Sequence, residues 1–167
     1  MSEVSARVHA DCIKLRAAGR GLRAPTHAGV LILGPSGAGK SDLALRLIAS
    51  GAVLVASDQT DLFVKGRKLC ARAPRRLRGL IEVRGLGVID IPYAESTSLS
   101  LVVQLADRAE RMPAAERYAP PSSLRLPKAE WPPLIRLVGH EASAAAKITA
   151  AVGAFARGAL RENVKRD

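Results

Sequence analysis

Eight consecutive residues carry the clearest chemistry in this chain, because they have the spacing of a phosphate-binding loop. They read G-x-x-x-x-G-K-S and comprise Gly34, Pro35, Ser36, Gly37, Ala38, Gly39, Lys40 and Ser41. In such a loop the glycines let successive backbone N–H groups point at phosphate oxygens. The lysine reaches the β- and γ-phosphates, and the serine hydroxyl binds Mg²⁺. The motif therefore predicts a site for ATP and Mg²⁺.

The residues on either side of the loop predict the strand and the helix that the motif requires. Residues 29–33 form a short apolar run, which is typical of a buried parallel strand. Residues 42–49 are strong helix formers without Pro or Gly. The N-terminus of that helix adds a partial positive charge of roughly +0.5 beside the phosphates. This context disfavours the alternative of a glycine-rich turn that binds nothing.

The remaining elements predict an α/β fold with a mixed central sheet flanked by helices. Several strands follow one another without intervening helices, which argues against an evenly wound parallel sheet. We expect one or two short strands in residues 5–15, a basic loop or hairpin in 16–28, and a helix from residue 142 onward. The other expected strands are 52–56, 62–64 and 68–70 (a hairpin), 80–83, 88–91, 99–104 and 134–138. A single domain over residues 1–167, with a flexible tail at 161–167, fits this length.

Two further segments are conspicuous for composition rather than periodicity. Residues 112–133 contain six prolines and predict a long, irregular and mobile segment of the kind that often serves function. Residues 72–78 are basic and are expected to form a solvated loop, with contact to an acidic partner as the alternative.

Composition limits the class of protein. The formal net charge is +11, which favours anionic partners. Only 3% of the residues are aromatic, too few for the stacking platforms of a single-strand nucleic-acid binder. Cys12 and Cys70 form neither a C-x-x-C pair nor a zinc spacing, which indicates free thiols in a reducing compartment. With no apolar run of about 20 residues and no signal peptide, we expect a cytoplasmic protein that binds neither membrane nor nucleic acid.

The absence of a guanine-recognition motif narrows the class of nucleotide enzyme. A protein that reads guanine needs an Asn-Lys-x-Asp element, and the only asparagine here is Asn163. A conventional GTPase is therefore disfavoured, whereas a small-molecule kinase fits the length of the chain.

A second motif carries a resemblance to a known family. Residues 81–91 read I-E-V-R-G-L-G-V-I-D-I and, with the phosphate loop and the strand ending at Asp58, resemble HPr kinase/phosphorylase. His9-Ala10 also resembles the His-Gly or His-Ala of that family. The resemblance spans about residues 5–155 and corresponds to the C-terminal catalytic domain, as in short forms of the family. It implies a fold close to that of phosphoenolpyruvate carboxykinase and a homo-oligomer, a hexamer in the family.

The resemblance also implies an activity. Such proteins phosphorylate a seryl residue of the phosphocarrier protein HPr, and many also remove that phosphate with inorganic phosphate, releasing pyrophosphate. On this basis we hypothesise that Asp58 is the general base of the kinase reaction and, when protonated, the acid of phosphorolysis. A carboxylate at the end of such a strand can instead hold Mg²⁺, and this alternative stays open.

The resemblance assigns further residues to the site. Glu82 matches a Mg²⁺-associated glutamate, and Arg84 can stabilise charge on the transferring phosphoryl group or orient Glu82. His9 is expected near the phosphates or the base, while Asp61 is either a second acid or only a sheet-end contact. We assign no role to His27 or His140, because a lone histidine is more often structural.

Two departures from the family pattern bear on phosphorolysis. Many members have two adjacent aspartates where this chain has Ser57-Asp58, and a paired carboxylate helps a group act as both base and acid. The family also has a basic Arg-Pro-Gly-Arg-Asn-like loop before its last helix, whereas residues 138–141 read V-G-H-E here. Two alternative functions therefore stay open, a small-metabolite kinase and a non-catalytic nucleotide sensor.

Overall fold

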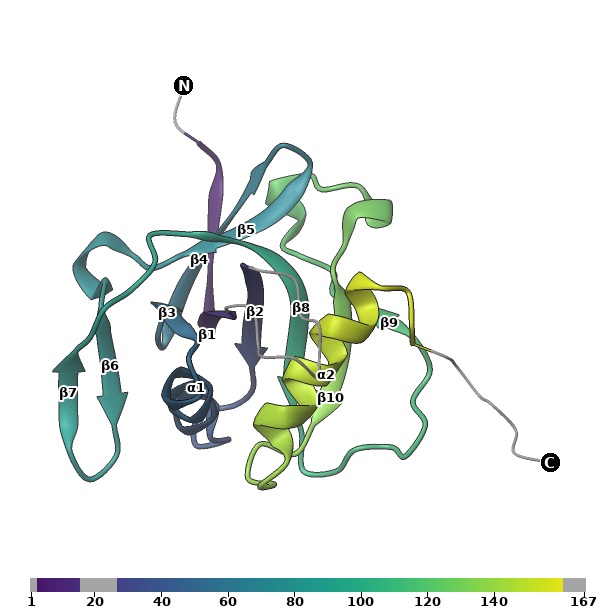
Figure 1. The fold of residues 1–167 in the computed structure, drawn as a ribbon. Coiled ribbons are helices and arrows are strands. Elements are labelled where there is room, and N and C mark those ends of the chain that lie inside the picture. Colours follow the sequence, from purple (N-terminus) through teal and green to yellow (C-terminus); the bar gives the residue numbers. More distant parts are fainter. Residues whose placement is uncertain (1–2, 16–26, 161–167) are drawn as a thin grey trace.

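The computed structural model describes residues 3–15 and 27–160, and Figure 1 shows the arrangement of their elements. Most of the loop expected at 16–28 and the tail expected at 161–167 lie outside the described residues. The strands are β1 Ser5–Leu15, β2 Ala28–Leu33, β3 Val53–Ala56, β4 Gln59–Lys65, β5 Lys68–Arg72, β6 Leu80–Val83, β7 Gly87–Asp90, β8 Thr97–Leu105, β9 Glu116–Arg117 and β10 Pro133–Leu137. The α-helices are α1 Lys40–Ala49 and α2 Ala144–Ala156, and short 3₁₀ helices cover Arg75–Leu77, Ser122–Leu124 and Lys128–Glu130.

Strand β2 lies at the centre of the sheet and leads directly into the glycine-rich loop. It pairs antiparallel with β1 on one side and parallel with β8 on the other. Five of its six residues are buried, because both faces of the strand are covered. The near-continuous apolar run in the sequence follows from that double burial.

Strand β1 differs from the one or two short strands that the sequence predicts. It is a single strand of 11 residues that serves two groups of neighbours. Its first half, through His9, pairs with β4, whereas its second half pairs with β2 and β3. Burial changes from alternating to nearly continuous at Ala10, where the strand acquires neighbours on both of its faces. That change of pattern within one strand explains why the sequence left open whether there were one or two strands.

The pairings close into a circuit that runs β2, β1, β4, β5, β8 and back to β2. The pairs β2–β8 and β8–β10 are parallel and the others in the large sheet are antiparallel. The mixed sheet predicted from the clustering of strands is therefore confirmed.

Two apolar clusters lie on opposite faces of β2 and β8. One contains Val30 and Val103 and packs under both helices, including Leu43 of α1 and Ile148 of α2. The other contains Leu31 and Val102 and is covered by the β4–β5 hairpin and by residues Leu124 and Leu126. Both α-helices thus cover the same face of the sheet, as Figure 1 also shows.

The segment at 112–133 is irregular, as expected, but it is anchored to the core. Leu124 and Leu126 are buried, and the indole N–H of Trp131 donates to the carbonyl of Leu126 at 3.1 Å. These contacts make the segment part of the packing on the second face rather than a free loop.

The β6–β7 hairpin forms a separate two-stranded sheet that stands beside α1 (Figure 1). It contains most of the E-V-R-G-L-G motif, so this motif reaches the site from outside the large sheet. No helix among the described residues has the length and apolar character needed to cross a membrane.

Candidate active site

The glycine-rich loop connects the end of β2 to the first residue of α1. Gly37 and Gly39 have φ angles of +80° and +90°, a region that side chains other than glycine rarely adopt. Lys40 is the first residue of the helix, and its ammonium group donates to the carbonyls of Gly34 at 2.8 Å and Pro35 at 3.0 Å. The loop therefore curls around its own lysine, which places a buried positive charge at the helix N-terminus.

Asp58 occupies the tip of a three-residue turn between β3 and β4. The N–H of Gln59 donates to the carbonyl of Ser57 at 2.7 Å, and Asp58 has a φ of +67°. These features define a γ-turn of the rare type with positive φ, which is strained for a residue with a side chain. Such strain persists only where the surroundings impose it and is concentrated at functional sites.

Residues of β1 hold this turn in place. The carboxyl Oδ1 of Asp11 accepts the N–H of Asp58 at 2.6 Å, and the N–H of Ala10 donates to the carbonyl of Asp58 at 3.1 Å. The side chain of Asp58 remains well exposed, with its Oδ1 at 3.3 Å from Nδ1 of His9. The backbone of Asp58 is thus tied to the sheet while its carboxylate faces solvent beside a histidine.

Asp11 is the most unusual residue of this group. It is fully buried in a strand that is otherwise apolar from Ala10 to Ile13. Burial raises the pKa of its carboxyl, although the Asp58 N–H, the Ser41 hydroxyl and the charge of Lys40 act in the opposite direction. Its Oδ2 atom has no hydrogen-bond partner of normal geometry. Asp11 was not among the residues predicted from the sequence, although a charged residue inside a buried strand is itself a signal.

These groups share one cavity of about 490 Å³ with the tip of the β6–β7 hairpin. Hairpin residues Glu82 and Arg84 are exposed and reach the cavity from the side of α1. The lining residues predicted from the sequence are His9, Ser36, Gly37, Gly39, Lys40, Ser41, Asp58, Glu82 and Arg84. Gly34, Pro35 and Ala38 belong to the same loop but do not line the cavity. Residues from four separate parts of the sequence therefore meet at the carboxyl end of β2.

His140, to which the sequence analysis assigns no role, also lines this cavity. It packs so closely on the glycine-rich loop that a Cβ added at Gly39 would lie 3.0 Å from its Cε1. Arg46 of α1 holds the neighbouring backbone by donating to the carbonyls of Gly139 and Glu141. No local pattern reveals this placement, because it depends on a contact between α1 and a loop more than 90 residues later.

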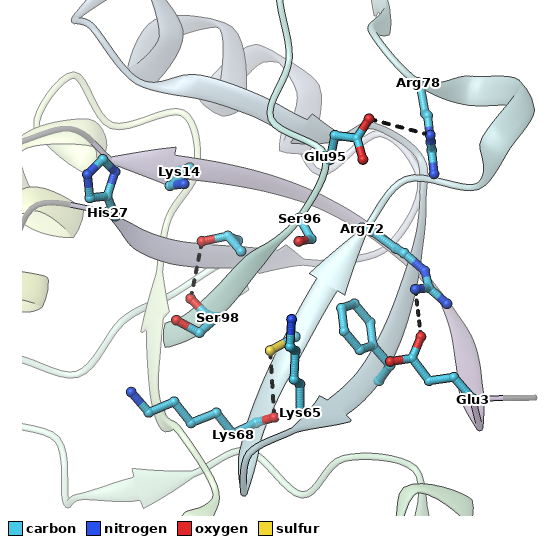
Figure 2. Close-up of a pocket in the computed structure, with 13 residues that line it drawn as sticks. Glu3, Lys14, His27, Lys65, Lys68, Arg72, Arg78, Glu95, Ser96 and Ser98 are labelled. Atoms are coloured by element: carbon cyan, nitrogen blue, oxygen red, sulfur yellow. Dashed lines mark hydrogen bonds and ion pairs between the residues drawn. The ribbon is translucent and has the colours of Figure 1, made fainter.

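Other candidates lie elsewhere. Asp61 pairs with Arg7 across β1 and β4 at 2.7 Å and does not line the cavity, which agrees with a sheet contact. His27 lines a different cavity of about 640 Å³, shown in Figure 2. Basic side chains are numerous there, but Arg72 is paired with Glu3 at 2.7 Å and Arg78 with Glu95 at 3.8 Å. This second cavity contains none of the residues that the two motifs supply.

The donor set of the first cavity suits Mg²⁺ bound together with a nucleotide. Within residues 3–15 and 27–160, the His, Cys, Asp and Glu side chains form no group of three or more that could hold a metal by themselves. Magnesium in phosphoryl-transfer sites needs only one or two protein oxygens, because phosphates and water complete its shell. The Ser41 hydroxyl and the Glu82 carboxylate, which both line the cavity, meet that requirement.

Comparison with known proteins identifies the family. The family model described as the HPr serine kinase C-terminal domain matches residues 25–124, more than half of the chain. The chain belongs to this family. The resemblance seen in the sequence is thereby confirmed.

Relatives of this HPr serine kinase C-terminal domain agree with that assignment. The HPr kinase/phosphorylase of Caldicellulosiruptor bescii is 42% identical over 85 residues, which cover 46% of this chain and 27% of the relative. That of Cupriavidus metallidurans is 44% identical over 102 residues, 54% of this chain and 32% of the relative. The matches thus span about a third or less of these relatives' lengths.

A solved structure shows the same fold over nearly the whole domain. The Hpr(Ser) kinase/phosphatase from Coxiella burnetii has a TM-score of 0.63 and covers 92% of this chain and 95% of its own, at 22% identity. The residues matched by the family model include the glycine-rich loop, Asp58, Glu82 and Arg84. His9, Asp11 and His140 lie outside the matched residues but line the cavity, and of these three only His9 was expected there from the sequence.

Proposed function

We propose that the chain is an ATP- and Mg²⁺-dependent protein-serine kinase that phosphorylates a seryl residue of the phosphocarrier protein HPr. The observation that carries this proposal is the strained turn at Asp58, which holds an exposed carboxylate in the same cavity as the phosphate loop. Family membership supports the acceptor, because the relatives are named HPr kinase/phosphorylase.

The roles of the residues follow from two requirements of phosphoryl transfer, which are neutralisation of the negative phosphates and removal of the seryl proton. Lys40 and the N–H groups of the loop neutralise the phosphates, and Mg²⁺ held by Ser41 and Glu82 would supply further neutralisation. The seryl oxygen attacks the γ-phosphorus, the bond to the ADP oxygen breaks, and the seryl proton passes to Asp58. His9 lies against Oδ1 of Asp58 and orients that carboxylate. Arg84 balances charge on the transferred group.

Phosphorolysis would run on the same groups in reverse. A phosphate oxygen would attack the phosphoseryl phosphorus to form pyrophosphate, and the protonated Asp58 would return its proton to the seryl oxygen. Ser57 removes the adjacent carboxylate that many family members have, but Asp11 brings another one to the backbone of Asp58. We therefore include phosphorolysis in the proposed function. Assays of phosphate transfer to HPr, and of its removal by inorganic phosphate, test it.

The central experiment compares the wild-type chain with Asp58→Asn. Labelled ATP and Mg²⁺ are supplied with purified HPr, with HPr whose target serine is replaced by alanine, and with a panel of small hydroxylated metabolites. We expect transfer to HPr alone, lost with the alanine acceptor. The Asp58→Asn chain should lose about 100-fold or more of the transfer rate, the usual contribution of a general base, while retaining nucleotide binding.

The same experiment separates the alternatives. Label appearing only on a small molecule would replace the proposal by a small-metabolite kinase. Nucleotide binding without product on any acceptor would indicate a sensor. Loss of Mg²⁺·ATP binding in Asp58→Asn, with residual transfer, would assign Asp58 to the metal instead of the proton.

A further inference from the structure

The buried Asp11 carboxyl contacts the site with one oxygen and leaves the other unused. Oδ1 accepts the Asp58 N–H, whereas Oδ2 is buried without a hydrogen-bond partner of normal geometry. Asp11 is 0% exposed and lines the same cavity as the phosphate loop. An unpaired buried polar atom lowers stability, so its retention inside an apolar strand calls for an explanation.

Two donors from the start of α1 lie near this carboxyl. The Lys40 ammonium already donates to the carbonyls of Gly34 and Pro35. The Ser41 hydroxyl acts on the Asp11 carboxyl without completing a hydrogen bond to Oδ2. The hydroxyl of Ser41, which lines the same cavity as Asp11, is therefore the donor available to Oδ2.

The chemistry of a hydroxyl explains why this contact matters when a metal is bound. A serine hydroxyl has one proton to donate and lone pairs to accept or coordinate. If its oxygen coordinates Mg²⁺, its proton must point away from the cation toward an acceptor. Outer-shell acceptors of this kind orient metal ligands and tune the affinity of the site.

We propose that Asp11 is a positioning residue that links the two halves of the site. Its Oδ2 receives the Ser41 proton and turns the Ser41 oxygen toward the Mg²⁺ of the bound nucleotide, while its Oδ1 holds Asp58 in the strained turn. This inference rests on the proposed function for the identity of the nucleotide complex. It also accounts for the missing carboxylate at Ser57, because an aspartate 47 residues earlier lies beside Asp58 in space.

The test is Asp11→Asn, since the amide oxygen can still accept the Asp58 N–H but the amide nitrogen cannot accept the Ser41 proton. Mg²⁺ is titrated calorimetrically into the chain saturated with a non-hydrolysable ATP analogue. We expect the Mg²⁺ affinity to fall by about 10–100-fold, as for other outer-shell partners, with the metal-free affinity for the analogue unchanged. Asp61→Asn is the matched control, because Asp61 is paired with Arg7 away from the cavity and its loss should leave Mg²⁺ affinity at the wild-type value.

A double-mutant cycle with Ser41→Ala tests whether Asp11 acts on Mg²⁺ binding through the Ser41 hydroxyl. If Asp11 acts through the Ser41 hydroxyl, Asp11→Asn should weaken Mg²⁺ binding no further once that hydroxyl is absent. Wild-type Mg²⁺ affinity in Asp11→Asn, or full additivity in the double mutant, would overturn the inference. Should Asp11→Asn fold poorly, Asp11→Ala, which also removes the acceptor, and the Mg²⁺-dependent part of the thermal shift given by the analogue supply the comparison.

Failure of the Asp11 inference can be distinguished from failure of the proposed kinase function. A wild-type chain that binds Mg²⁺ with the analogue but transfers nothing to HPr would refute the kinase proposal, while the Asp11 comparison would still decide the inference. A wild-type chain that binds no Mg²⁺ with the analogue would overturn both.

Discussion

At the scale of single residues, the site is built on backbone strain. Asp58 has a positive φ, and both of its backbone polar groups are bound by Ala10 and Asp11 of β1. A residue with a side chain loses about 1–3 kcal/mol of stability in such a sparsely populated conformation. The surrounding sheet offsets this cost and thereby directs the carboxylate into the cavity.

The strain predicts a difference between two inactive variants. Asp58→Gly and Asp58→Ala both remove the carboxylate, but only glycine adopts the turn without a steric cost. We expect the glycine variant to have a free energy of unfolding about 1 kcal/mol above that of the alanine variant. Urea unfolding measures both free energies. Equal stabilities of the glycine and alanine variants would mean that the turn relaxes instead of storing strain.

At the scale of elements, helix α1 contributes to the cavity in two ways. Its N-terminus carries Lys40 and Ser41, and its Arg46 holds the loop between β10 and α2 through two backbone carbonyls. That loop brings His140 against Gly39 of the phosphate loop. One helix therefore couples the position of a distant loop to the shape of the nucleotide site.

Arg46→Ala tests whether the loop held by Arg46 supports the nucleotide site, beyond the effect of removing a surface charge. Hydrogen bonds from a charged donor to two carbonyls are lost, so we expect stability to fall by about 2 kcal/mol and nucleotide affinity to weaken. Arg67→Ala is the control, because Arg67 forms an exposed pair with Glu130 that is worth about 0–1 kcal/mol. Thermal unfolding and calorimetry measure both variants. Unchanged nucleotide affinity in Arg46→Ala would show that the loop does not support the site.

At the scale of the whole molecule, the closed circuit of strands isolates the core from solvent. Cys12 of β1 is fully buried in the cluster between the sheet and the β4–β5 hairpin. Burial raises the pKa of its thiol far above the usual range, which leaves little reactive thiolate. The reaction of Cys12 with a thiol reagent should therefore require opening of the circuit.

Labelling of Cys12 can accordingly report the opening of the whole fold. In a Cys70→Ser background, we expect an aromatic disulfide reagent to label Cys12 at a rate that follows the unfolded population. Mg²⁺·ATP should slow the labelling, since a ligand that binds only the folded chain stabilises it. Rapid labelling under native conditions, unaffected by the nucleotide, would contradict a closed core.

The sequence by itself determined the features that depend on neighbouring residues. The phosphate loop is one turn with one helix after it, so Gly34 to Ser41 could be recognised directly, and the buried strand β2 was visible as an apolar run. Asp58 lies two residues after the apolar strand β3, and its role was expected from the resemblance to the family.

Only the tertiary structure decided the features that depend on distant partners. Strand β1 runs through two sets of neighbours, and its pairing with β4 joins residues 50 or more positions apart. The contact of Asp11 with Asp58 and the packing of His140 on Gly39 likewise join residues that are distant in the chain. The burial of Leu124 and Leu126 likewise depends on the sheet beneath them. Such contacts arise from strand register and loop docking, which leave no periodic trace in the chain and appear only when the whole fold is assembled.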